Sequence, residues 1–191
     1  STSILGGLLT LRDNASLLNT KAITLNGSTL SLDNNANLAI DNTNRINDAA
    51  PISMSGGTIS YGSRANSNSS ERLGALTVNG ANVITATLNA LGTYQTADLT
   101  FASFTRGTGA TVNFTGTNLG AEGSNARILF DTGLANNTST NALGGWAIHN
   151  STDFAGYNVA QGAGALGTPG FQGYTPGYTD AGGALHGFSS S

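Results

Sequence analysis

The stretch Ile23-Thr24-Leu25-Asn26-Gly27, followed by Leu30 and Leu32, is the pattern that decides the fold. It recurs twice, as Ile52-Ser53-Met54-Ser55-Gly56 before Ile59 and Tyr61, and as Leu76-Thr77-Val78-Asn79-Gly80 before Val83. The shared unit has apolar residues at alternate positions, then Asn or Ser, then Gly, then a second apolar stretch. Successive copies follow one another after 24 to 29 residues, a period typical of solenoids and repeat arrays.

A second echo extends the repeat toward the N-terminus. The residues Leu9-Thr10-Leu11-Arg12-Asp13-Asn14-Ala15 match Leu30-Ser31-Leu32-Asp33-Asn34-Asn35-Ala36 at a spacing of 21 residues. Each unit consists of two short strands around a corner and cannot bury its own apolar side chains. We therefore expect burial to come from stacking one unit on the next.

Strands rather than helices are predicted throughout, because no apolar stripe of helical period is present and apolar residues alternate instead. Turn residues that tolerate positive φ separate the strands, as at Asn26-Gly27, Ser55-Gly56, Asn79-Gly80 and Gly107-Thr108-Gly109. The alternating pairs are Leu9 and Leu11, Ile23 and Leu25, Leu30 and Leu32, Leu38 and Ile40, Ile52 and Met54, Leu76 and Val78, Leu99 and Phe101, and Val112 and Phe114.

These patterns predict an all-β protein, a right-handed parallel β-solenoid (β-helix) in which each turn pairs with the turns above and below. At about 25 residues per turn and a strand spacing near 4.8 Å, the chain would make about seven turns and a rod about 35 Å long. The alternative is an antiparallel β-sandwich, since Asn-Gly pairs also suit hairpin turns.

Composition excludes several classes of protein. Only 9% of the 191 residues are charged and the net charge is −3, so the positive surface that nucleic acid requires is missing. Cys is absent, which excludes disulfides and thiolate metal sites. No apolar run approaches the roughly 18 residues of a membrane-spanning helix, and we expect any targeting signal to lie outside this chain.

The composition changes near residue 155. Residues 1–154 carry the repeat, whereas residues 155–191 are rich in Gly and Tyr, as in Gly170-Phe171-Gln172-Gly173-Tyr174. We expect a β-solenoid region over 1–154, and a tail over 155–191 that acts as a cap, a linker or a docking segment.

A longer pattern in the second half of the chain points to a family. It consists of Leu99–Gly120 with Arg127-Ile128-Leu129-Phe130, then Leu143-Gly144-Gly145-Trp146-Ala147-Ile148 and Thr152-Asp153-Phe154-Ala155-Gly156-Tyr157. Together these resemble the secreted, planctomycete-type bacterial surface proteins with autotransporter-associated β-strand repeats. The resemblance implies a β-solenoid passenger-like region, an extracellular or cell-surface location and a structural or adhesive role, with no catalytic residues. The family's short Gly-rich repeat core is not seen intact.

Charged residues offer little chemistry. Asp33, Asp41 and Asp48 fall near successive corners with Arg45 between two of them, and in a carbohydrate-processing β-helix enzyme such a group would act on a polysaccharide. Each lies in an Asn-rich turn, where Asp also caps the backbone, and we favour that interpretation. His149 and His186 are far apart, so the sequence predicts no catalytic residue, no metal site and no cofactor.

Four aromatic residues are candidates for contact with a partner or a glycan, because their rings are large, apolar and stiff. They are Trp146, Phe171, Tyr174 and Tyr178. The competing interpretation is that the tail simply covers the end of the solenoid.

The function predicted from the sequence is that of a non-catalytic structural module of an extracellular bacterial surface fibre or adhesin. The alternatives are the enzyme described above and a carbohydrate-binding module. Expected partners are surface glycans or other copies of the chain in a head-to-tail filament. In that filament the uncharged first strands, from Ile4 to Leu11, would meet the tail of the next copy.

Overall fold

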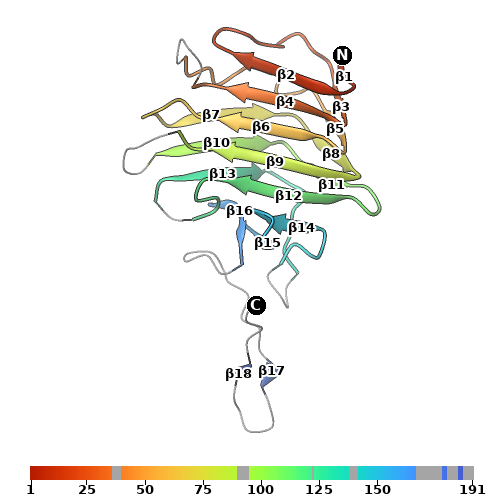
Figure 1. The fold of residues 1–191 in the computed structure, drawn as a ribbon, viewed down its shortest axis with the longest axis vertical. Coiled ribbons are helices and arrows are strands. Elements are labelled where there is room, and N and C mark those ends of the chain that lie inside the picture. Colours follow the sequence, from red (N-terminus) through yellow and green to blue (C-terminus); the bar gives the residue numbers. More distant parts are fainter. Residues whose placement is uncertain are drawn as a thin grey trace.

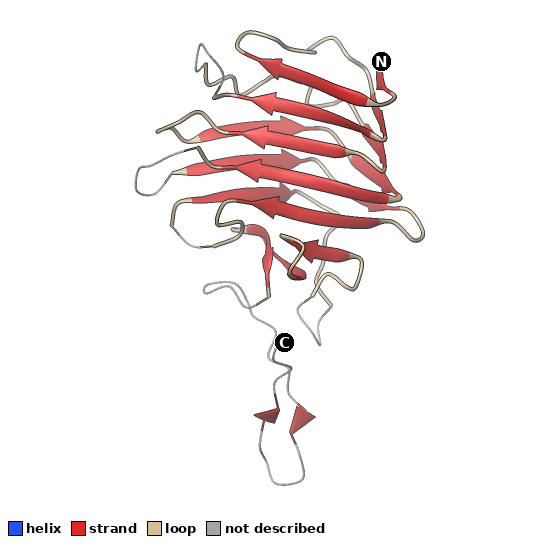
Figure 2. Cartoon of the chain, viewed as in Figure 1, coloured by secondary structure: helices blue, strands red, loops and turns tan. Residues whose placement is uncertain are grey.

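A computed structural model of the chain is entirely β, with no helix among the residues that the structure describes. These are residues 1–35, 40–89, 95–121, 123–137 and 142–166, with the backbone of 178–179 and 185–186. Within them, no helix has the length and apolar character needed to cross a membrane. The strands stack in parallel layers along the long axis of the molecule (Figures 1 and 2).

Two sheets form the first two sides of the coil. The first has five parallel strands, β1 (Thr2–Ile4), β3 (Ile23–Asn26), β5 (Ile52–Ser55), β8 (Leu76–Asn79) and β11 (Phe104–Arg106). The second begins with five parallel strands, β2 (Gly7–Arg12), β4 (Ser28–Asp33), β6 (Thr58–Gly62), β9 (Ala81–Thr87) and β12 (Thr111–Gly116). It continues with β14 (Ala147–His149), which is parallel to β12, and then with β15 (Asp153–Asn158) and β16 (Gly162–Ala165), which pair antiparallel.

A third side exists only in the later turns. It consists of three parallel strands, β7 (Ser69–Leu73), β10 (Thr96–Phe101) and β13 (Asn125–Phe130). In the first two turns, loops occupy this side. An isolated parallel β-bridge between Leu17 and Ile46 joins these two loops. A separate two-stranded pair, β17 (Tyr178–Thr179) and β18 (Leu185–His186), lies in the tail.

The register confirms the repeat predicted from the sequence. Ile23 pairs with Ile52, and Ile52 pairs with Leu76, so equivalent residues of the motif lie directly above one another. The echo at a spacing of 21 residues is also confirmed, because Leu9 pairs with Leu30.

One position of the repeat differs from the expectation. Ile84 rather than Val83 pairs with Ile59 and is fully buried. The stretch after Gly80 contains one residue more than the stretch after Gly56, and the Asn82 amide fills the extra space by accepting a bond from the Gly57 N–H at 3.1 Å.

The alternating pairs predicted from the sequence lie on strands and bury their apolar side chains, with Leu9 half-buried. The exception is Leu38 with Ile40, since Leu38 lies outside the described residues and Ile40 is not in a strand. One interior column shows the packing, as Leu30, Ile59, Ile84 and Phe114 follow in register and are fully buried. Burial of such a side chain contributes about 1.5–3 kcal/mol, so the thin core is stabilised by repetition.

The corner between the first two sides repeats as well. Gly27, Gly56 and Gly80 all have positive φ, at 56°, 68° and 66°, and the Gly27 N–H donates to the Ser55 carbonyl one turn along. A side chain at these positions would be strained, which explains why glycine recurs there.

The stack makes about four turns rather than the expected seven. The estimate of seven treated all 191 residues as solenoid, but β14 is the last strand to join in parallel, and two antiparallel strands follow it. The parallel pairing also excludes the antiparallel β-sandwich for this stack.

Candidate functional site

The charged residues singled out in the sequence belong to the scaffold. Arg45 is fully buried in the side that lacks strands, and its guanidinium donates four hydrogen bonds. The acceptors are Asn34 Oδ1 at 2.9 Å and the carbonyl oxygens of Asp13, Ala15 and Asp33 at 3.0, 2.9 and 3.1 Å. One side chain thus joins the loops of the first two turns.

The three carboxylates do not surround Arg45 as acceptors. Asp33 Oδ1 accepts the N–H of Asn35 at 2.8 Å, which is the backbone cap expected of a turn Asp. Asp41 Oδ1 accepts from Asn34 Nδ2 at 3.0 Å, and Asp48 is exposed. The hydrogen bonds of Asp33 and Asp41 therefore stabilise turns and loops.

Glu71, which the sequence analysis did not single out, completes the network. It lies at an inward position of β7 and is 1% exposed. Its Oε1 accepts the N–H groups of Arg45 and Ile46, at 2.8 and 3.0 Å. Burial raises the pKa of Glu71 to about 7, although the two backbone donors and the Arg45 charge act in the opposite direction. The alternation Ser69-Ser70-Glu71-Arg72-Leu73 was the signal that could have placed Glu71 inside.

Trp146, the first of the predicted contact residues, is half-buried at the C-terminal end of the stack. Its ring stacks on Phe104 with centroids 5.5 Å apart, and the Arg106 guanidinium lies 5.3 Å from the ring centroid. The indole Nε1 donates to the Leu143 carbonyl at 3.0 Å. Trp146 therefore covers β11, the last strand of the first sheet.

The other three predicted contact residues belong to the tail. Phe171 and Tyr174 lie outside the described residues, and of Tyr178 only the backbone, in β17, is described.

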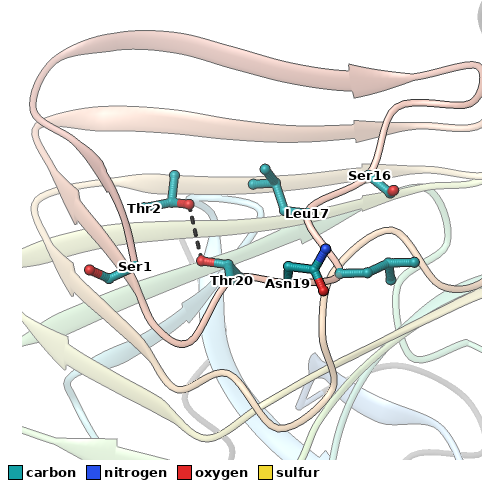
Figure 3. Close-up of a pocket in the computed structure, with 7 residues that line it drawn as sticks. Ser1, Thr2, Ser16, Leu17, Asn19 and Thr20 are labelled. Atoms are coloured by element: carbon teal, nitrogen blue, oxygen red, sulfur yellow. Dashed lines mark hydrogen bonds between the residues drawn. The ribbon is translucent and has the colours of Figure 1, made fainter.

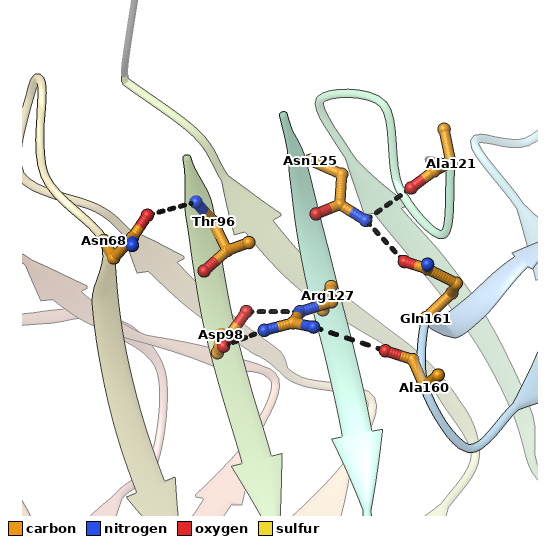
Figure 4. Close-up of polar contacts among 8 residues, drawn as sticks. All are labelled: Asn68, Thr96, Asp98, Ala121, Asn125, Arg127, Ala160 and Gln161. Carbon is orange, nitrogen blue, oxygen red and sulfur yellow. Dashed lines mark hydrogen bonds and ion pairs between the residues drawn. The ribbon is translucent and has the colours of Figure 1, made fainter. Parts of the chain in front are cut away.

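Side chains close the C-terminal end of the third side. The Tyr157 hydroxyl donates to the Phe130 carbonyl and accepts the Phe130 N–H, each at 2.8 Å. Along the same edge, Arg127 forms an ion pair with Asp98 and donates to the Ala160 carbonyl, while Asn125 donates to Gln161 Oε1 at 3.0 Å (Figure 4). Polar groups of β15 and the turn after it thus take the place of a further strand beside β13.

The N-terminal end is open in comparison. β1 and β2 are the outermost strands of their sheets, and within the described part of the chain no strand pairs with their outer edges. Leu5, Leu8 and Leu18 at this end are 74%, 66% and 46% exposed. Bare strand edges with apolar side chains are the feature of a sheet that most readily takes another chain.

An open hollow of about 430 Å³ lies beside β1, bounded by the loop that follows β2 (Figure 3). The hydroxyls of Thr2 and Thr20 are 3.0 Å apart across it. The side chains that line it are uncharged, and none is larger than Leu. They belong to Ser1, Thr2, Ser16, Leu17, Leu18, Asn19 and Thr20. We therefore take the whole N-terminal end, the edges of β1 and β2 with these loops and leucines, as the candidate interaction surface.

Within the described residues, no group of three or more His, Cys, Asp or Glu side chains could hold a metal ion. His149 is half-buried on β14, where burial lowers its pKa, and the His186 side chain is outside the described part. No protein-family model, curated protein or solved structure matches this chain.

Proposed function

We propose that this chain is a non-catalytic structural module of an extracellular bacterial surface fibre or adhesin. The observation that carries the proposal is the hydrogen bonding of Arg45 and Glu71. Both charged side chains are buried, and their hydrogen bonds go to loop backbone and to Asn34. They hold neighbouring turns together, as the interior of a structural rod requires.

The backbone architecture supports the same role. Every turn pairs in register with the next through parallel ladders on two or three sides. Stability in such a stack is a sum of turns and of the interfaces between neighbours, so it can be extended along one axis without a change of core. The coil is taken as right-handed, because parallel crossover connections have that hand in about 98% of cases.

The resemblance to proteins with autotransporter-associated β-strand repeats supports the surface location. It rests on the residues around Trp146 and Phe154 and on the strands before them. The partners that fit this role are other copies of the chain, or glycans at the cell surface.

Two measurements test the proposal. Antibodies against this chain should label intact cells of the source bacterium, and protease added to intact cells should remove the label. Purified protein incubated with a panel of bacterial and plant polysaccharides should release no new reducing ends or unsaturated products. Labelling only after permeabilisation would overturn the location, and turnover of any polysaccharide would overturn the structural role.

A further inference from the structure

Exposed large apolar side chains gather at the two ends of the stack. Six such residues occur in the described part of the chain, and none lies on the sides of the middle turns. Leu5, Leu8 and Leu18 lie at the N-terminal end, and Ile148, Phe154 and Val159 lie at the other, with Val159 87% exposed. Both sets are apolar and can pack against each other, whereas the sides between them present mainly short polar side chains.

Register connects the two sets. Leu8 on β2 begins an outward-facing column that runs across the second sheet and ends with Ile148 on β14 and Phe154 on β15. The residues between are Thr29, Thr58, Val83 and Asn113. Because β16 follows β15 in the sheet, Leu8 of a second copy stacked along the same axis would lie one strand beyond Phe154 of the first.

The two ends also differ in charge. Arg12 and Lys21 are exposed near the N-terminal end, with Asp13 half-buried beside Arg12, and Asp153 lies at the other end, where Arg106 is also exposed. Contact between two N-terminal ends would bring their cations together, whereas contact between unlike ends brings Arg12 and Lys21 toward Asp153. Within the described residues, the outer edges of β2 at one end of the second sheet and of β16 at the other pair with no strand, so unlike ends can also meet edge to edge.

We propose that copies of this chain associate end to end, with Leu5, Leu8 and Leu18 of one copy packed against Ile148, Phe154 and Val159 of the next. The occupant of the N-terminal end is thus the C-terminal end of a second copy. Such a contact is heterologous and leaves a free end on each side, so it propagates into a filament. The inference rests on the proposed function, since it supplies the way in which fibre modules meet.

Sedimentation velocity of the full chain over a concentration series, at low and high salt, tests the contact. The wild type should form species that grow with concentration, and more weakly at high salt. Leu8→Glu and Phe154→Glu should each weaken association about tenfold or more, because a charge replaces an apolar side chain of the proposed interface. Val83→Ser is the matched control, since it removes an apolar residue from the middle of the same column.

Mixing the two variants gives the distinguishing result. The Leu8→Glu copy keeps an intact C-terminal end and the Phe154→Glu copy keeps an intact N-terminal end. Equal amounts should therefore form a one-to-one dimer that does not grow further, because the two ends left free both carry a carboxylate. Circular dichroism checks that each variant keeps its β signal, and if either loses it, Leu5→Glu and Val159→Glu replace the pair.

Other outcomes overturn the contact. A wild type that stays monomeric at several hundred micromolar excludes it, and so does association that both variants leave unchanged. If only Leu8→Glu weakens association, two N-terminal ends meet instead. If deletion of residues 167–191 abolishes association, the tail is the occupant. Surface labelling of cells is independent of all these results, so the proposed function and this contact can fail separately.

Discussion

The Tyr157 hydroxyl makes two hydrogen bonds to the backbone of Phe130, donating to its carbonyl and accepting from its N–H, each at 2.8 Å. In the two earlier strands of this side, the equivalent residues Leu73 and Phe101 pair with the next strand instead. The ring also lies 6.1 Å from the Phe130 ring. One side chain therefore ends the growth of the third side of the coil while leaving little backbone unpaired there.

Tyr157→Phe should lower the free energy of unfolding by about 1–3 kcal/mol, because the ring stays but a buried carbonyl and N–H of Phe130 lose their partner. Urea denaturation followed by circular dichroism measures the change. Tyr61→Phe is the matched control, since the Tyr61 hydroxyl is buried without a hydrogen bond to any described residue. Equal losses for the two variants would contradict the capping role of Tyr157.

Arg45→Met should destabilise the protein by about 3 kcal/mol or more, because the buried Asn34 side chain and the carbonyls of Asp13, Ala15 and Asp33 would lose their donor. The measurement is again the midpoint and slope of urea denaturation. Arg64→Met at an exposed position should change stability by less than about 0.5 kcal/mol. A tolerated Arg45→Met would show that the loops of the first two turns are held by other contacts.

Glu71 should make stability depend on pH in the direction opposite to ordinary acid denaturation. Its pKa is about 7 in the folded protein, chiefly because of burial, against an ordinary value of 4.5. The folded state thus binds this proton more tightly, so the contribution of Glu71 is full below pH 4.5 and is lost as the pH rises through 7. The loss should be on the order of 3 kcal/mol.

Unfolding of Glu71→Gln and of the wild type, measured from pH 4 to pH 9, isolates this effect because all other titrating groups are shared. A Gln oxygen can still accept the N–H groups of Arg45 and Ile46, as Oε1 of Glu71 does. The difference in stability between the two proteins should shift in favour of the variant as the pH rises through 7. A difference that does not vary with pH would contradict the raised pKa.

Gly56→Ala should cost about 1–2 kcal/mol through backbone strain alone, because φ is 68° and the nearest atom to a new methyl group is 3.8 Å away. Gly145→Ala is the control, as nothing lies within 4 Å and its φ is not in the positive region. Thermal unfolding should show a lower midpoint for Gly56→Ala only. Equal midpoints would indicate that the corner can change its turn type.

Much of the stack could be predicted from residues that are close in sequence. Alternation in Ile23-Thr24-Leu25 and its two copies indicates strands that bury one face, and the Asn-Gly and Ser-Gly pairs indicate the corners. The spacing of the copies then sets which strands stack, and the register of Ile23 on Ile52 and of Ile52 on Leu76 follows it. The strands and corners depend on residues close in sequence, so they recur although the loops between the copies differ in length.

The ends of the stack and the side without strands depend on contacts that local patterns do not contain. Arg45 lies in an Asn-rich turn that predicts exposure, and it is buried because the loop of the preceding turn and the end of β4 bring three carbonyls around it. Tyr157 resembles any strand residue until β15 turns back and sets its hydroxyl against Phe130. Sequence alone therefore determines the period, the strands and the corners of this protein. The tertiary structure decides which charges are buried, where the coil stops and which apolar side chains remain exposed at its ends, because each depends on partners far away in the chain.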